Sequence, residues 1–257
     1  MTGGTPLEQP PTARSFAELV DRAVRLAEDP PRRTDHPGPG TAPGGGPAVL
    51  GIAGPPGAGK TTLALAVVAA VLARLGPDSA RHVPMDGFHL ADVELDRLGR
   101  RDRKGAPDTF DPAGYAALLA RIRAGGPDTV YAPAFDRDIE QPVAGSIPVL
   151  PGTRLVVTEG LYLLGDGPWT AARGLLDEAW YVELAGSGRT ERLVHRHEVF
   201  GKEHDAAVEW VARVDGTNAT RVERRRSTAD LLVPGDLSLD GDGPRDDECV
   251  QVAGRRT

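Results

Sequence analysis

Short apolar runs alternate with longer amphipathic stretches along most of this chain. The run Ala48–Ala53 is short and apolar except for one glycine, which is typical of a buried strand. The stretch Lys60–Leu75 carries apolar residues at helical spacing and precedes Gly76-Pro77, which predicts a helix that ends there. The same reasoning predicts strands at 81–86, 154–158, 179–184 and 229–233, and helices from 112 onward, at 189–200 and at 206–226.

Strands that alternate with helices are the pattern of an α/β domain with a mostly parallel sheet. In such sheets, ligands bind beyond the carboxyl ends of the strands. Polar side chains that follow the predicted strands are therefore the first candidates for chemistry.

The two ends of the chain differ from this central pattern. Ser15 and Glu18 form a capping box, which predicts the start of a helix with Phe16, Leu19 and Val20 on its apolar face. Proline and glycine then dominate residues 29–47, and the chain after Pro234 is acidic and rich in glycine. We therefore predict three parts: an N-terminal helix with a linker over 1–47, a domain over 48–233, and a loose tail over 234–257.

The composition adds one sharp clue to this division. The 257 residues include 32 glycines and 23 prolines, and much of this excess lies in the predicted linker and tail. Arginine supplies most of the 30 basic side chains, and the only lysines are Lys60, Lys104 and Lys202. Because lysine is so scarce here, each lysine is a candidate for a specific role.

Charge and cysteine content narrow the class of protein. A formal net charge of −7 argues against nucleic-acid binding, which needs a basic surface. No apolar run is long enough to span a bilayer, and the N-terminus lacks the pattern of a signal peptide. The single cysteine, Cys249, cannot form an internal disulfide. We expect a cytoplasmic protein with a small-molecule partner and no nucleic-acid or membrane partner, for which a homodimer stays open.

A phosphate-binding loop follows the first predicted strand of the domain. The segment from Gly54 to Thr61 matches the pattern G-x-x-x-x-G-K-[ST], between a strand and a helix. Glycines let the backbone N–H groups curl around a phosphate, and the lysine and hydroxyl of such loops reach phosphate and Mg²⁺. We therefore expect ATP and Mg²⁺ as cofactors. The predicted ATP-binding residues are Gly54, Pro55, Pro56, Gly57, Ala58, Gly59, Lys60, Thr61 and Thr62, with Thr61 also a metal ligand.

Two carboxylates follow later strands at the same expected edge of the sheet. Asp86 closes the second predicted strand, where a carboxylate can orient an acceptor hydroxyl and take its proton. Glu159 follows the strand predicted at 154–158, where P-loop enzymes place an acid that contacts Mg²⁺ through water. Asp86 is therefore predicted to be catalytic and Glu159 to belong to the metal site.

Basic and aromatic side chains complete the candidate site. Arg189, Arg192 and Arg196 recur at helical spacing on one face, where they could neutralise a transferring phosphoryl group. We predict Lys60, Arg192 and Arg196 to join Asp86 in catalysis. Two loops with charged and aromatic residues suit a polar small-molecule pocket. The predicted substrate-binding residues are His89, Arg103, Lys104, Tyr131, Phe135, Asp136 and Arg137.

Three functional classes fit a P-loop with these partners. A small-molecule kinase explains the acceptor-side residues, because they serve only when something polar besides water binds. A switch or metallochaperone that hydrolyses nucleotide is one alternative, and an inactive nucleotide-binding regulator is another. A GTPase is disfavoured because Asn218, the only asparagine, lies outside any guanine-reading motif.

The order of these motifs over residues 48–233 resembles the uridine kinase, phosphoribulokinase and type I pantothenate kinase superfamily. The motifs are Gly54 to Thr62, Asp86-Gly-Phe-His89, Arg103-Lys104-Gly105, Tyr131 to Arg137, Glu159-Gly160 and the arginine-rich helix. Within it, the chain looks most like bacterial nucleoside and nucleotide kinase-like proteins, a group with members described as sugar kinases.

The resemblance implies a P-loop kinase fold with three α/β/α layers, a five-stranded mostly parallel sheet and a helical lid at about 186–204. It implies ATP- and Mg²⁺-dependent phosphoryl transfer to a hydroxyl of a small metabolite. Asp86 would be the base and Arg192 and Arg196 lid arginines, with Arg189 on the same helix. The stretch after Asp86 is nearer to pantothenate kinases than to uridine kinases, so nucleosides, pantothenate-like compounds and sugars all stay open as acceptors.

Overall fold

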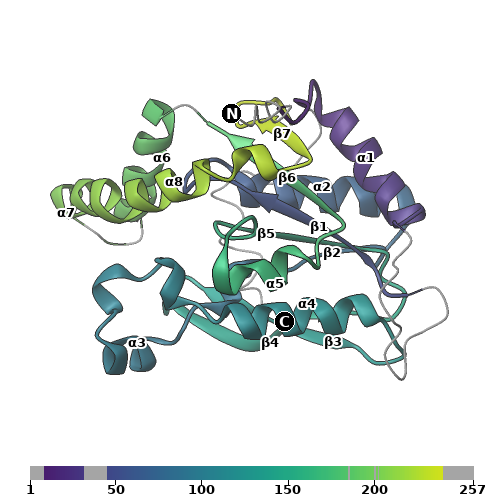
Figure 1. The fold of residues 1–257 in the computed structure, drawn as a ribbon, viewed down its shortest axis with the longest axis horizontal. Coiled ribbons are helices and arrows are strands. Elements are labelled where there is room, and N and C mark those ends of the chain that lie inside the picture. The colour runs from purple at the N-terminus through teal and green to yellow at the C-terminus, as the bar shows by residue number, and fades with distance from the viewer. Residues whose placement is uncertain (1–8, 32–44, 185, 200, 202, 240–257) are drawn as a thin grey trace, which may run out of the picture.

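A five-stranded parallel sheet forms the centre of the protein (Figure 1). The computed structural model describes residues 9–31, 45–184, 186–199, 201 and 203–239. The strand order is β2-β5-β1-β6-β7, and every neighbouring pair is parallel, as the sequence predicts. The strands are β1 (Ala48–Ala53), β2 (Ala80–His82), β5 (Leu155–Gly160), β6 (Glu178–Glu183) and β7 (Leu231–Pro234).

Helices cover both faces of this sheet and give the three predicted layers. Both β1 and β5 are buried along their whole length, because apolar side chains from each face enclose them. On one face lie α1 (Phe16–Glu28) and α2 (Lys60–Leu75). On the other lie α4 (Pro112–Ala124) and α5 (Thr170–Arg173), with the aromatic side chains of Tyr115, Tyr162 and Trp169 between them and the sheet.

The predicted N-terminal helix packs against the sheet domain. Ser15 caps α1 through a hydrogen bond from the Glu18 N–H, as the capping box predicts. Residues before the helix pair with β7, since the Ala13 N–H donates to the Leu232 carbonyl at 2.8 Å. The apolar face of α1 shares one buried cluster with α2, β1 and β5. The predicted division of the chain at residue 47 stays a prediction, and most of the predicted linker (32–44) lies outside the described residues.

A β-hairpin stands where the sequence predicts an irregular loop. Strands β3 (Val130–Asp136) and β4 (Gln141–Val149) pair antiparallel and form a second sheet. The prediction of a loop over Tyr131–Arg137 was wrong. Its cause is Pro133, which is unfavourable inside a regular strand but is tolerated here because the register shifts between Ala132 and Ala134.

Other differences concern element ends. Strand β2 stops at His82, short of the predicted residue 86: the Val83 N–H still donates to the Val157 carbonyl, and Pro84 then begins the turn into a 3₁₀ helix. Asp86 lies instead on a 3₁₀ helix, Met85–Phe88, and Glu159 lies inside β5 rather than after it. The helix predicted at 206–226 is three segments. These are α7 (His204–Trp210), a π-helix (Val211–Asp215) and α8 (Gly216–Glu223).

The remaining short elements lie mostly around the predicted acceptor loops. Among the described residues no helix has both the length and the apolarity that crossing a membrane requires.

After β7, Leu237 and Leu239 still pack on the core, so the predicted loose tail begins later than Pro234, and residues 240–257 lie outside the described ranges. The other elements are α3 (Asp92–Leu98), α6 (Gly186–Val199), and 3₁₀ helices at Arg101–Arg103, Pro107–Thr109, Gly167–Trp169 and Arg226–Thr228.

Candidate active site

The predicted phosphate-binding loop joins β1 to α2 and has the backbone that phosphate binding requires. Gly54, Gly57 and Gly59 have φ angles of 152°, 75° and 92°, a region that side-chain-bearing residues rarely adopt. A Cβ on Gly54 would also lie 2.7 Å from the Val182 carbonyl oxygen. The Lys60 ammonium donates to the Pro55 carbonyl at 3.0 Å across the loop. The loop is therefore curled around the start of α2, where the helix N-terminus favours an anion.

The charges of both predicted carboxylates, Asp86 and Glu159, act on Lys60. It is only 9% exposed, and this burial lowers its pKa from the ordinary value of 10.5. The charges of Glu159 and Asp86 act in the opposite direction and favour the ammonium form. The structure thus brings together three residues that lie far apart in the sequence.

The two side chains predicted for the metal site, Thr61 and Glu159, lie in contact. The Thr61 hydroxyl donates to Glu159 Oε1 at 3.1 Å, and Glu159 is 4% exposed. His82, which the sequence analysis missed, faces the same carboxylate with its Nε2 3.8 Å from Oε1. No group of three or more potential metal-ligating side chains occurs within the described ranges. A hydroxyl and one acid beside a phosphate loop nevertheless suit Mg²⁺, which takes few protein ligands and keeps water and phosphate oxygens.

Asp86 occupies the acceptor side of this group. Burial alone would raise its pKa, but the charges of His89, Arg137, Lys60 and Arg196 together hold the pKa below the ordinary 3.8. Arg137 Nη2 lies 3.5 Å from Asp86 Oδ2. The Asp86 side chain is therefore an ionised carboxylate, the form that can accept a proton.

The arginine helix α6 packs on the phosphate loop, but its three arginines are not equivalent. A Cβ on Gly57 would lie 2.9 Å from Leu193 Cγ and 3.1 Å from Arg189 Cγ, so α6 covers the loop closely. Arg189 is largely buried, and its Nε and Nη1 have no hydrogen-bond partner, with Glu223 3.9 Å from Nη1. The positive charge of Arg196 lowers the pKa of both Lys60 and Asp86, whereas Arg192 is exposed to solvent. The catalytic roles of Arg192 and Arg196 both stay predictions.

Aromatic rings pack around His89, which contacts the backbone of Asp86. The His89 ring lies 3.9 Å from the Phe110 ring centroid and 4.8 Å from that of Phe135. His89 Nδ1 lies 2.9 Å from the Asp86 carbonyl oxygen, and burial lowers the pKa of His89 from 6.5. Two backbone hydrogen bonds join the segment around His89 to the segment around Phe110: the Asp111 N–H donates to the Phe88 carbonyl, and the Leu90 N–H donates to the Thr109 carbonyl.

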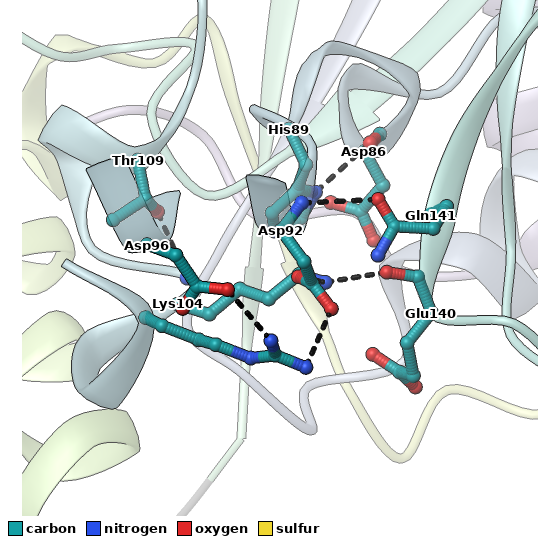
Figure 2. Close-up of polar contacts among 10 residues, drawn as sticks. Asp86, His89, Asp92, Asp96, Lys104, Thr109, Glu140 and Gln141 are labelled. Carbon is teal, nitrogen blue, oxygen red and sulfur yellow. Dashed lines mark hydrogen bonds and ion pairs between the residues drawn. The ribbon is translucent and has the colours of Figure 1, made fainter. Parts of the chain in front are cut away.

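Figure 2 shows a polar network that ties three segments together near Asp86. The Lys104 ammonium donates to Asp92 Oδ1 at 2.7 Å and to the Glu140 carbonyl, and it lies 5.3 Å from the centre of the Phe135 ring. The Asp92 N–H in turn donates to Gln141 Oε1 at 3.1 Å. Lys104 therefore joins the 101–105 segment, the start of α3 and the hairpin turn.

The remaining predicted substrate residues have structural partners in this arrangement. Arg103 forms an ion pair with Asp108. The Asp136 carboxylate accepts from the Asp138 N–H at 2.9 Å and so shapes the hairpin turn. Tyr131 is 58% exposed on β3. The structure places His89, Phe135 and Arg137 beside Asp86, and Lys104 next to them, but it uses Arg103 and Asp136 to hold the loops.

Further residues join the site that no sequence motif indicates. Asp215 lies at the end of the π-helix and is buried. Its charge raises the pKa of Lys60, and its Oδ2 lies 3.0 Å from His197 Nε2 on α6. Tyr162 Oη and Asn218 Nδ2 both donate to the Gly105 carbonyl, at 2.6 and 3.2 Å. The π-helix, a form often found at functional sites, is what turns Asp215 inward. Only tertiary packing brings these residues to the site.

The residues present fit a nucleoside triphosphate with Mg²⁺. The curled loop offers its N–H groups, the start of α2 offers its positive end, and Lys60 supplies a cation. Arg189 lies over Gly57, and its buried Nε and Nη1 form no hydrogen bond. An anion bound there would give these nitrogens an acceptor.

Comparison with known proteins agrees with this geometry. A provisional uridine kinase of Schizosaccharomyces pombe is 34% identical over 230 residues, which cover 87% of this chain and 92% of that protein. A solved structure from Silicibacter sp. TM1040, provisionally described as a fructose transport system kinase, is 34% identical with a TM-score of 0.72, and the match covers 86% of this chain and 99% of that one. The chain belongs to the P-loop kinases of the uridine kinase, phosphoribulokinase and pantothenate kinase superfamily.

More distant relatives of this P-loop kinase carry other substrate names. A pantothenate kinase of Mycolicibacterium vanbaalenii is 32% identical over 138 residues, covering 53% of this chain and 44% of that protein. No protein-family model matches the chain. The predicted α/β fold and the predicted superfamily are confirmed. Because the relatives differ in the substrates that they are named for, the kinase class is shown but the acceptor is not.

Proposed function

We propose that this P-loop kinase transfers the γ-phosphoryl group of ATP to a hydroxyl group of a small polar metabolite. One observation carries the proposal: the Asp86 carboxylate is close enough to the buried P-loop lysine for the two charges to interact, and His89 and Arg137 also lie beside it. A carboxylate in that position has no role in nucleotide binding alone. It is where an acceptor hydroxyl would need its proton taken.

The proposed reaction assigns each group a balanced part. The acceptor oxygen forms a bond to the γ-phosphorus as the bond from that phosphorus to the β,γ-bridging oxygen breaks, and ADP leaves. The acceptor proton passes to the Asp86 carboxylate. Lys60 and Arg196 stabilise the negative charge on the transferring group, and the contact of α6 with Gly57 keeps water from the site. Mg²⁺ held near Thr61 and Glu159 would neutralise phosphate charge when bound.

A substrate screen tests this proposal directly. Purified protein with Mg²⁺ and ATP is offered nucleosides, pantothenate, hydroxy acids and sugars, while ADP release and product mass are followed. The proposal predicts ADP release that depends on one acceptor and a product heavier by one phosphoryl group. Rapid ATP hydrolysis without any acceptor would instead indicate a nucleotide-hydrolysing switch, and ATP binding without turnover would indicate an inactive regulator.

Variants then separate the proposed roles. Asp86→Asn should lower kcat by roughly 10²-fold or more, the usual weight of acid–base catalysis, while ATP binding is kept. Asp78→Asn is the matched control, because Asp78 is exposed before β2, and asparagine also tolerates its φ of 63°. Equal kcat for Asp86→Asn and Asp78→Asn would remove Asp86 from the role of base.

The P-loop lysine and the lid arginines need different measurements. Lys60→Ala should weaken ATP binding as well as turnover. Arg196→Ala should lower kcat more than it raises the KM of the acceptor, because its charge acts on Lys60 and Asp86, and we expect the same pattern for Arg192→Ala. An effect on KM alone would make either arginine a binding residue.

A further inference from the structure

The proposed base is paired with a cation. Arg137 lies in the turn between β3 and β4, and its Nη2 is 3.5 Å from Asp86 Oδ2. The guanidinium lies 6.0 Å from the centre of the Phe135 ring. Its side chain is 39% exposed, so solvent screens this ion pair and weakens it.

The neighbouring basic side chains are bound differently. Lys104 is 14% exposed and is held by Asp92 and by the Glu140 carbonyl. Arg103 is held by Asp108. These two cations neutralise carboxylates for which the proposed reaction has no use, whereas Arg137 faces the carboxylate that must take a proton. Its present position therefore suits the protein without an acceptor better than it suits the reaction.

A cation beside Asp86 has a chemical consequence. It stabilises the charged carboxylate and thereby makes Asp86 a weaker base. A neutral acceptor gives the guanidinium no reason to leave. An acceptor with its own anionic group offers a stronger partner, because arginine binds carboxylate and phosphate through two parallel hydrogen bonds.

We propose that the acceptor of this kinase is an anionic hydroxyl compound, and that Arg137 binds its anionic group and leaves Asp86 as the hydroxyl arrives. This inference rests on the proposed function and names its substrate class. Binding of the anion places the hydroxyl at Asp86, so the acceptor proton goes to a carboxylate that has just lost its cation. The acceptor oxygen then forms the new bond to the γ-phosphorus, and ADP leaves with the electrons of the broken bond.

Matched pairs of acceptors test the inference. Glycerate against glycerol and pantothenate against pantothenol vary a carboxylate, and ribulose 5-phosphate against ribulose varies a phosphate. Each pair is assayed for ADP release and product mass with the wild-type protein, Arg137→Gln and Arg137→Lys. The control is Arg97→Gln, because Arg97 is 69% exposed on α3 and pairs with Glu94 on the same helix rather than with Asp86.

The expected result is turnover of the anionic member of at least one pair and little of its neutral partner. Arg137→Gln should then lower kcat/KM for the anionic acceptor by roughly 10- to 100-fold, the worth of a hydrogen bond to a charged group, mainly through KM. Arg137→Lys should recover part of this loss, and Arg97→Gln should behave as wild type. Whether the carboxylate or the phosphate series responds identifies the anion.

Other results overturn the inference in distinguishable ways. Equal use of a neutral and an anionic partner, or an anionic preference that Arg137→Gln leaves unchanged, would refute it and leave the proposed function intact. ATP hydrolysis with no phosphorylated product from any acceptor would refute the proposed function, and the inference would fall with it.

Discussion

Replacing Gly160 with alanine tests how the proposed base is held in place. Gly160 ends β5, and a Cβ there would lie 2.6 Å from both Cβ and Sδ of Met85. Met85 is fully buried and directly precedes Asp86 on the same 3₁₀ helix. The thioether can rotate away, but Cβ is fixed to the backbone, so the 3₁₀ helix itself has to move.

The size of the effect follows from this geometry. Ordinary carbon contacts are about 3.5–4.0 Å, so Met85 must shift by about 1 Å, and Asp86 with it. Overpacking of this kind costs about 1–3 kcal/mol, which lowers the Tm of a protein of this length by about 2–4 °C for each kcal/mol. A displacement of about 1 Å at a catalytic group can lower kcat about 10²-fold. Affinity for ATP should change less than kcat, because the three atoms nearest to the added Cβ all belong to Met85.

Thermal unfolding, ATP titration and turnover of the acceptor that the screen identifies measure these effects. Gly174→Ala is the control: its φ is −63°, and a Cβ there would lie at an ordinary 3.6 Å from the nearest atom, the Ala171 carbonyl oxygen. We expect it to stay within about 0.5 kcal/mol of wild type. A Gly160→Ala protein with the Tm and kcat of wild type would refute the reasoning.

Three further predictions concern other groups of the site. Arg189→Met should raise the Tm of the nucleotide-free protein, because it removes buried nitrogens that form no hydrogen bond and only a long ion pair with Glu223, yet weaken ATP binding by roughly 10- to 100-fold in a calorimetric titration; a lower Tm with unchanged affinity would contradict it. Burial lowers the pKa of His89 from 6.5, so the unfolded chain binds a proton that the folded protein does not, and the free energy of unfolding should fall as pH drops below about 6.5. Denaturant unfolding at several pH values should show a smaller decrease for His89→Phe than for wild type. Thr61→Val should raise the Mg²⁺ concentration needed for half-maximal ATP binding, and an unchanged Mg²⁺ titration would exclude the hydroxyl from the metal site.

Local sequence patterns predicted the parts of the fold and site that local physics determines. The glycines and lysine of the phosphate loop act within a few residues of one another, so the spacing of Gly54, Gly59 and Lys60 was enough to place them between a strand and a helix. Asp86 and Glu159 were found because parallel strands end at one edge of the sheet. The two residues lie on other elements than predicted, but they still meet around Lys60 as expected.

The rest of the site depends on contacts between segments that the sequence does not connect. The hairpin β3–β4 was missed because Pro133 and Pro142 disfavour strands, although Pro133 lies at a register shift and Pro142 still pairs with Phe135. Lys104 was assigned to the substrate, and only the fold shows that Asp92 and the Glu140 carbonyl hold it. Nothing in the pattern around Asp215 indicates the π-helix that turns it inward.

The central claim is transfer of a phosphoryl group to an acceptor hydroxyl with Asp86 as base. A single-turnover experiment tests it most directly: protein loaded with Mg²⁺ and ATP is mixed with the identified acceptor, and the fate of the γ-phosphoryl group is followed by mass. Our account predicts acceptor phosphorylation in one step by the wild-type protein, slowed roughly 10²-fold or more in Asp86→Asn at unchanged ATP affinity. Transfer of the group to water at the same rate with and without acceptor, or equal rates for the two proteins, would contradict it.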